Sequence, residues 1–199
     1  LGDTLPFSER QVDHRNFVIP LEIQERGILR VVIRVQTNSS MRIPLSLWHP
    51  QSFFEQDGKT VVLQGIYFGL ALVMALYNLF VFFGLRERVY LYYVAFVTTF
   101  VIFQTSLGGF SYQFFWGDSP WWAEKNLLFF WALASLLGCV FAIEFLELRK
   151  HAKNHFTFLS GLCWGAGVIA LLIFFLAYPT SIRLLAVLLF LGVVGCLSA

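Results

Sequence analysis

The side chains of this chain that could do chemistry are few, and the densest group is a mixed acidic and basic cluster after a long apolar run. Its members are Glu144, Glu147, Arg149, Lys150 and Lys153. An ionisable group deep in a membrane marks a proton relay or an ion site, whereas charges at the membrane edge form solvated ion pairs. Because this cluster lies at the end of the run, we expect interfacial ion pairs. A gate or a coupling element is the alternative.

Two histidines, His151 and His155, lie four residues apart, a spacing that would place both on one face of a helix. The zinc-protease motif requires a glutamate directly after the first histidine, and Ala152 occupies that position. We therefore interpret both histidines as loop residues and expect no metal site. The cysteines lie in apolar runs without paired spacing, so they predict packing residues and no disulfide framework. They are Cys139, Cys163 and Cys196.

No nucleophile and base can be assembled within one leaflet, because His14 and His49 belong to the polar amino-terminal segment. We therefore expect no catalytic residues and no cofactor. Trp48 and His49 are the candidate ligand-binding residues, because an aromatic ring beside polar groups can bind a sugar. A tryptophan that anchors this segment to the membrane surface is the alternative.

Glycine pairs with the G-x-x-x-G spacing allow close approach of helix backbones, and Gly65 with Gly69 and Gly161 with Gly165 have this spacing. We expect them to pack inside a helical bundle, with a homodimer interface as the alternative. Asn78 lies within an apolar run, where an amide needs a hydrogen-bond partner. We therefore expect Asn78 to bond to another helix.

Most of these residues lie in or between long apolar runs, which are separated by short charged connectors. Apolar residues make up 58% of the chain and charged residues 13%, against about 45–50% and 25% in soluble domains. A bilayer core of about 30 Å needs about 20 apolar residues in a helix. The net charge of +2 does not indicate a nucleic-acid partner, and membrane lipid is the expected surrounding. The runs predict membrane helices at about 61–83, 90–108, 124–147, 156–178 and 182–199.

The segment before these runs has the alternating pattern of β-strands. Strands are predicted from Phe17 to Ile23, from Leu29 to Val35 and from Met41 to Trp48. Three strands bury too little surface to stand alone. We therefore expect residues 1–57 to be the last part of an antiparallel β-sandwich, and residues 58–199 to be a partial membrane bundle. The chain begins without a visible leader and stops within an apolar run, so we expect a longer protein.

The connectors also predict the orientation in the membrane. Connectors 84–89 and 147–155 carry most of the basic residues, whereas the other two connectors hold only Lys125 and Arg183. By the positive-inside rule the basic connectors are cytoplasmic, which places residues 1–57 outside. The basic residues concerned are Arg86, Arg88, Arg149, Lys150 and Lys153.

Several stretches resemble one known family. The region from Gly65 to Tyr93, which includes Tyr77-Asn78-Leu79-Phe80 and Leu85-Arg86-Glu87-Arg88, resembles the first two helices of the bacterial seven-transmembrane receptors with diverse intracellular signalling modules. The connector from Phe115 to Trp122 and the helix end from Phe145 to Arg149 resemble the same family. Residues 2–7 and 14–17 resemble the end of its periplasmic sensor domain, a jelly-roll-like β-sandwich similar to carbohydrate-binding modules.

The resemblance implies further helices after Ala199, followed by a cytoplasmic module such as a histidine kinase of a two-component system, a cyclic-di-GMP cyclase or phosphodiesterase, or a phosphatase. We therefore expect a receptor fragment in a bacterial inner membrane that senses a periplasmic, carbohydrate-like small molecule and controls a module of the same full-length chain. The fragment itself is not expected to be an enzyme. The alternatives are a transporter or channel, a membrane-embedded enzyme and a passive anchor. A transporter would need polar groups near mid-membrane, where the runs offer only groups such as Thr98, Thr99 and Ser135.

Overall fold

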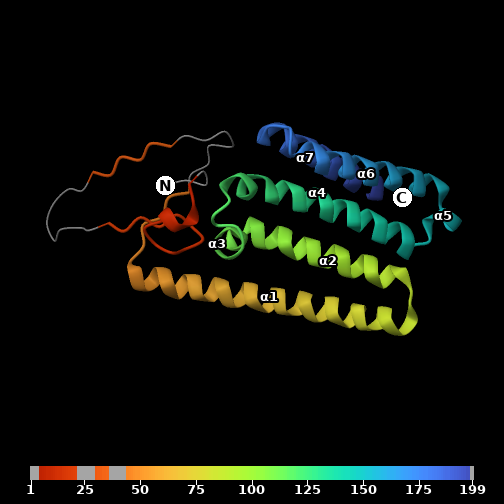
Figure 1. Ribbon diagram of the computed structural model, residues 1–199, viewed down its shortest axis with the longest axis horizontal. Helices are drawn as coiled ribbons and strands as arrows, with labels where there is room; N and C mark the ends of the chain where they lie inside the picture. The colour runs from red at the N-terminus through yellow and green to blue at the C-terminus, as the bar shows by residue number, and fades with distance from the viewer. Residues whose placement is uncertain (1–4, 22–29, 36–43, 198–199) are drawn as a thin grey trace.

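The molecule is a bundle of long, roughly antiparallel helices with an irregular amino-terminal segment at one end (Figure 1). The computed structural model describes residues 5–21, 30–35 and 44–197. Its elements are the 3-10 turn η1 (Phe7–Glu9) and the helices α1 (Pro50–Leu85), α2 (Arg88–Leu107), α3 (Phe110–Phe114), α4 (Pro120–Phe145), α5 (Leu148–His151), α6 (Lys153–Leu172) and α7 (Tyr178–Leu197).

Local sequence explains where the longest helices begin and end. Pro50 and Pro120 each occupy the first turn of a helix, where their missing N–H is not needed. Helix α1 ends at Leu85, and the next residue, Arg86, adopts the left-handed conformation with φ 60° and donates its N–H to Phe82 O. Glu87 then precedes α2 in an extended conformation. The α1–α2 connector is therefore a tight hairpin of two helices.

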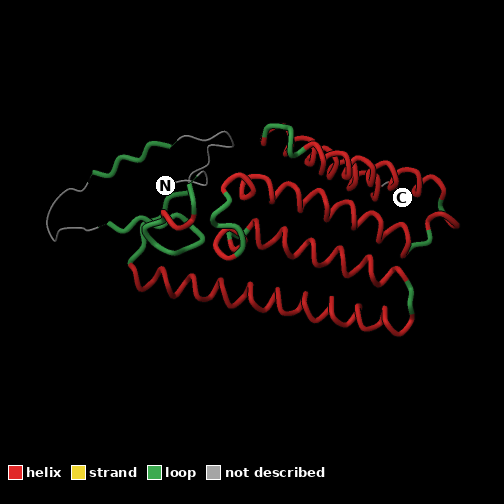
Figure 2. Tube along the Cα trace, viewed as in Figure 1, coloured by secondary structure: helices red, strands yellow, loops and turns green. Residues whose placement is uncertain are grey.

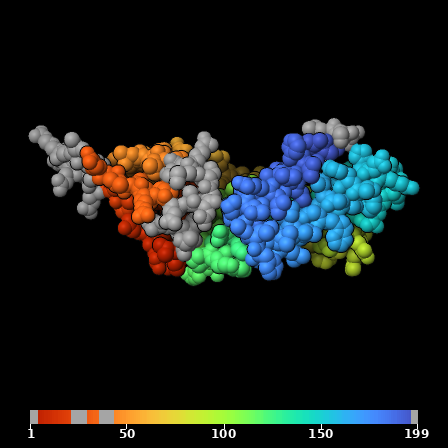
Figure 3. All heavy atoms as spheres, turned by 90° about the horizontal axis from the view of Figure 1, so that it is seen from above, coloured from red at the N-terminus to blue at the C-terminus, as the bar shows by residue number. Residues whose placement is uncertain are grey.

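Helix α4 is the centre of the bundle. It packs against α2 on one side and against α6 on the other, while α1 packs on α2 and α7 packs on α6. Figure 3 shows α6 and α7 side by side along one face of the molecule. The buried core lies where α4, α6 and α7 meet, and it consists of Leu128, Ala132, Ile169, Ala170, Ile173 and Leu185.

The outer surface of the bundle is apolar, as a lipid-exposed surface must be. Large side chains such as Phe80 and Phe175 are 78% and 87% exposed to the surroundings. Within the described residues, five helices are long and apolar enough to cross a membrane: α1, α2, α4, α6 and most of α7. The expectation of a multi-pass helical membrane protein is confirmed.

Helix α1 is longer than a membrane is thick. Its 36 residues extend about 54 Å at 1.5 Å per residue, against a hydrocarbon core of about 30 Å. It begins at Pro50 and not near Val61, so the residues that we assigned to the end of the β segment form its first turns. About four turns of α1 therefore have room to stand outside the hydrocarbon core.

The β-sandwich expected for residues 1–57 is not confirmed. The parts of the three expected strands that the structure describes, residues 17–21, 30–35 and 44–48, are irregular, and Figure 2 shows them as loop. The remaining strand positions lie outside the described residues. A strand is defined by hydrogen bonds to a neighbouring strand, and an alternating pattern alone does not supply that neighbour.

Candidate functional site

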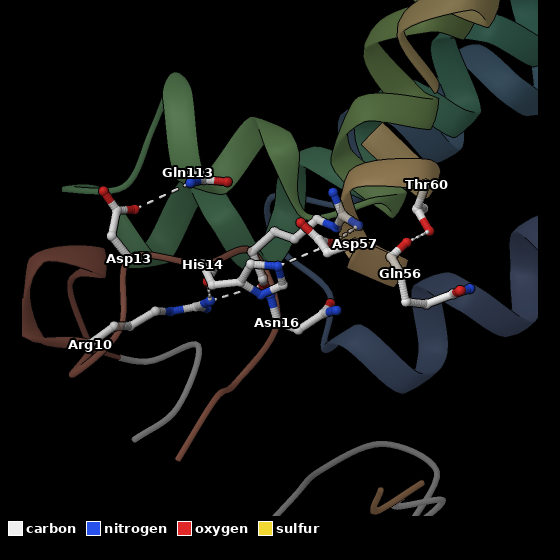
Figure 4. A network of polar contacts seen from close by, with 9 residues as sticks. Arg10, Asp13, His14, Asn16, Gln56, Asp57, Thr60 and Gln113 are labelled. Carbon is white, nitrogen blue, oxygen red and sulfur yellow. Dashed lines mark hydrogen bonds and ion pairs between the residues drawn. The ribbon is translucent and has the colours of Figure 1, made fainter. Parts of the chain in front are cut away.

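The amino-terminal segment folds against the end of the bundle opposite α5 (Figure 1). We call this contact the outer junction: residues 5–17 on one side, and the first turns of α1 with the connector 108–119 on the other. Figure 4 shows its polar side chains, among them Gln113, whose amide donates to Asp13 Oδ1 at 3.2 Å. The junction joins segments that are far apart in the sequence.

Backbone contacts hold the segment close to α3. The N–H of Phe7 donates to the carbonyl oxygen of Gly117 at 2.9 Å, and the Tyr112 hydroxyl donates to the carbonyl oxygen of Leu5. A Cβ atom added at Gly117 would lie 2.9 Å from Phe7 Cβ and 3.0 Å from Tyr112 O. Only a glycine therefore lets the two segments approach so closely.

A buried charge cluster forms the centre of the outer junction. Asp57 on α1 pairs with the guanidinium of Arg15 at 2.5 Å and lies 3.2 Å from His14 Nε2. His14 is buried, its ring packs edge-on against Phe53 of α1, and its Nδ1 accepts from the N–H of Asn16 at 3.0 Å. Nε2 of His14 faces the same carboxylate without a hydrogen bond to it. Asp57 thus contacts two consecutive residues of the segment and forms its ion pair with Arg15.

Arg10 stabilises the fold of the segment itself. Its Nη1 donates to the backbone oxygens of His14 and Arg15, both at 2.9 Å. The guanidinium carbon also lies 4.3, 4.7 and 5.2 Å from the ring centres of Phe17, Phe7 and Tyr112. Such cation–π contacts are strongest when desolvated. Arg10 therefore presents His14 and Arg15 to Asp57 in a fixed arrangement.

The junction is continuous with the helices of the bundle. The Arg15 guanidinium lies 4.6 Å from the ring centre of Phe110 on α3, and that ring packs edge-on against Phe68 of α1 at 6.4 Å. On the other side of α3, the buried Ser111 hydroxyl donates to Thr105 Oγ1 of α2 at 2.9 Å. Side-chain contacts therefore connect residues 5–17 to α1 and α3, and α3 to α2.

Aromatic side chains surround the connector between α3 and α4. The ring of Trp116 stacks on Phe130 at 6.1 Å, and Trp122 stacks on Phe174 at 6.2 Å. Rings of this kind prefer the headgroup level of a membrane. These rings lie at the ends of α4 and α6 that are beside the junction, where the headgroup level is expected.

The basic connectors lie at the opposite end of the bundle (Figure 1). Lys150 Nζ pairs with Glu147 Oε2 at 2.9 Å, and this contact holds the pKa of Glu147 below its usual value. The Arg149 guanidinium lies 5.3 Å from the ring centre of Phe156. The other charges that we singled out at this end are exposed, namely Glu144, Lys153, Arg86 and Arg88.

The glycines expected to pack helices together do not share one environment. A Cβ added at Gly65, Gly69 or Gly161 would meet nothing within 4 Å, whereas one at Gly165 would lie 3.1 Å from Leu188 Cδ1 of α7. Asn78 donates to Met74 O at 2.9 Å within its own helix. Sequence reasoning expected this bond to cross to another helix.

The candidate ligand residues Trp48 and His49 are exposed in the segment that leads into α1. In the described part of the chain, no group of three or more His, Cys, Asp or Glu side chains is placed to hold a metal ion. The outer junction was not singled out from the sequence as a site. Its only signals were isolated: the His14-Arg15 pair, the lone Asp57 and the glycines at 109 and 117.

Comparison with protein families gives two matches, and the boundary between them lies in the first turns of α1, which belong to the outer junction. Residues 60–199 match the model described as 7TM diverse intracellular signalling. Residues 1–49 match the model described as 7TMR-DISM extracellular 2. No curated protein and no solved structure matches the chain.

Proposed function

Since the chain belongs to the seven-transmembrane receptor family with diverse intracellular signalling modules, we propose that it carries a signal from a periplasmic ligand across a bacterial inner membrane. It is a multi-pass membrane protein with an extracellular segment and a signalling role. The family's extracellular and membrane models meet in this chain at the start of α1. A signal that passes from the extracellular segment to the membrane helices therefore has to pass the start of α1.

The observation that carries the proposal is the attachment of the extracellular segment to α1 through Asp57. A ligand changes the state of a receptor only by binding one arrangement more tightly than another. In this proposal, ligand binding displaces residues 5–17 and breaks or tightens the contacts of Arg15 and His14 with Asp57. Because α1 and α3 contact the same residues, the helices then move relative to one another.

Residues 1–57 are proposed to belong to the sensor domain and residues 58–199 to the membrane bundle. The alternating pattern of residues 17–48 supports strands of a jelly-roll-like β-sandwich within that sensor domain. A carbohydrate-like ligand fits the exposed Trp48 and His49, which lie beside the first turn of α1. Binding there would act on α1 directly.

The output is proposed to be a cytoplasmic histidine kinase, or a diguanylate cyclase or phosphodiesterase, in the same full-length protein. The basic connectors with Arg86, Arg88 and Arg149 support a cytoplasmic position for that end of the bundle. A homodimer is proposed to form through the open face of α1 that carries Gly65 and Gly69. Such a dimer would bring two output modules together.

The test is the output activity of the complete protein in membranes, with and without residues 1–49. The proposal expects removal of this segment to change the basal output and to abolish its response to periplasmic sugars. A protein whose output is the same with and without the segment would contradict the proposal. Unchanged signalling after replacement of the whole bundle by an unrelated membrane anchor would favour a passive anchor, and solute flux in reconstituted vesicles would favour a transporter.

A further inference from the structure

An apolar groove of about 550 Å³ lies between α4 and α6, and one of its ends is at α5. Its walls include Leu136 and Val140 of α4 and extend along α6 from Phe156 to Leu171. At 1.5 Å per residue this stretch of α6 is about 22 Å long. One leaflet of a 30 Å hydrocarbon core is about 15 Å deep. The groove is therefore long enough to hold one acyl chain of a single leaflet.

Two opposite charges line the end of this groove. Glu144 is the penultimate residue of α4, and Arg149 belongs to α5. Neither forms an ion pair with another side chain in the described residues, although Lys150 and Glu147 nearby pair with each other. The ring of Phe156, itself a lining residue, lies 5.3 Å from the Arg149 guanidinium. Both charges are thus available to a ligand in the groove.

We propose that this groove binds a phospholipid whose headgroup carries both a phosphate and a primary ammonium, as in phosphatidylethanolamine. The acyl chain occupies the apolar groove, the phosphate accepts from Arg149, and the ammonium donates to Glu144. Basic pockets between membrane helices on the cytoplasmic side are typical sites for lipid headgroups. Arginine suits a phosphate because its planar fork donates two parallel hydrogen bonds.

The carboxylate decides between headgroups. A lipid with a glycerol headgroup also has a phosphate for Arg149, but it has no cationic group to pair with Glu144. A quaternary ammonium has no N–H to donate to this carboxylate. A headgroup with both a phosphate and a primary ammonium pairs with both lining charges. A protein helix is a poorer occupant, because it would remove Glu144 and Arg149 from water without supplying a phosphate or an ammonium.

The test uses the complete protein, purified in detergent and exposed to mixed micelles of dioleoyl lipids with ethanolamine, choline or glycerol headgroups. Native mass spectrometry counts the lipid that each sample retains. We expect the ethanolamine lipid to be retained about tenfold more strongly than the other two, since one lost charge-assisted hydrogen bond is worth a factor of about ten. Glu144→Gln should remove this preference, whereas Arg149→Gln should lower the retention of all three lipids, because each of them carries a phosphate.

Matched controls come from the neighbouring ion pair. Lys150→Gln and Glu147→Gln remove the same charges from the same end of the bundle, but neither residue lines the groove. Both controls should keep the preference within about twofold of the unsubstituted protein. Loss of the preference in the controls as well would show a general surface-charge effect and overturn the proposal.

Location is tested separately with an ethanolamine lipid that carries a photoreactive group in its acyl chain. The proposal expects the label on Trp164 or Val168, which line the groove and are 78% and 49% exposed. Labelling confined to helices other than α4 and α6, or equal retention of all three lipids, would each overturn the proposal. None of these results bears on the outer junction, so failure here leaves the receptor proposal intact.

Discussion

The two ends of this bundle both carry ion pairs, but the pairs differ in what they connect. At the outer junction, Arg15 and Asp57 are 42 positions apart in the sequence and their side chains are only 8% and 19% exposed. At the inner end, Lys150 and Glu147 are three positions apart and 72% and 54% exposed. The first pair joins the amino-terminal segment to α1, whereas both residues of the second pair belong to the same short turn at α5. In our proposal, the first pair is therefore the one that transmits a movement of the extracellular segment to the helices.

The difference follows from the cost of burying charge. A buried pair loses its hydration, so removal of one partner leaves an uncompensated charge and is strongly destabilising. An exposed pair in water contributes little. Variants at the two ends should therefore differ sharply in effect, and they can be ordered by how far each contact is buried.

The largest effect is expected for Asp57→Asn, which leaves Arg15 buried without its carboxylate. We expect the outer junction to open more easily by about 2 to 3 kcal/mol, because part of the usual cost is screened at this partly exposed site. Trypsin cleavage after Arg10 and Arg15 should then accelerate by about 30- to 150-fold. Glu55→Gln is the control, since Glu55 is exposed on the same helix and should leave the cleavage rate unchanged.

A smaller effect is expected for Gly117→Ala. The added Cβ would lie 2.9 Å from Phe7 Cβ, so the amino-terminal segment has to move away from α3. Such overpacking costs about 1 to 3 kcal/mol, and cleavage after Arg10 should accelerate by about tenfold. Gly161→Ala is the matched control, because a Cβ there meets nothing within 4 Å. Destabilisation by the control comparable to that of Gly117→Ala would contradict the assignment of this contact to the junction.

The smallest effect is expected for Lys150→Gln at the inner end. The bond from Lys150 lowers the pKa of Glu147, whose side chain is exposed to solvent. A lowered pKa means that the pair stabilises the folded protein above the ordinary glutamate range and loses this contribution as pH falls through the lowered value. Lys150→Gln should raise the pKa of Glu147, measured by carbon NMR of the carboxyl group. It should leave the thermal midpoint unchanged, and a clear drop in that midpoint would break the contrast between the two ends.

The membrane bundle could be predicted from the sequence because its signal is local. Runs such as Val61 to Phe83 contain no charged residue, and each run by itself meets the length that a bilayer requires. The start of α1 was misplaced for a physical reason. Pro50 was a usable start signal, but the helix continues past the polar residues Asp57 and Lys59, where composition indicated a boundary.

The outer junction could not be predicted, because nothing local relates its partners. Asp57 next to Gly58 reads as a linker, and Arg15 reads as a solvated charge. Their contact depends on the path of residues 5–17 across α3, which the close approach at Gly117 permits. The hydrogen bond of Asn78 could not be predicted for the opposite reason. The sequence shows that an amide in lipid needs a partner, but it does not show whether that partner lies on another helix or, as at Met74, on the same one.

The most direct test of the central claim is a double-mutant cycle at the outer junction, with output activity of the complete protein as the readout. Arg15→Gln and Asp57→Asn are measured alone and together, without ligand. If the pair couples the extracellular segment to α1, each single variant shifts basal output in the same direction and the double variant shifts it no further than either alone. Output that does not change in either single variant, or shifts that simply add in the double variant, would contradict the account.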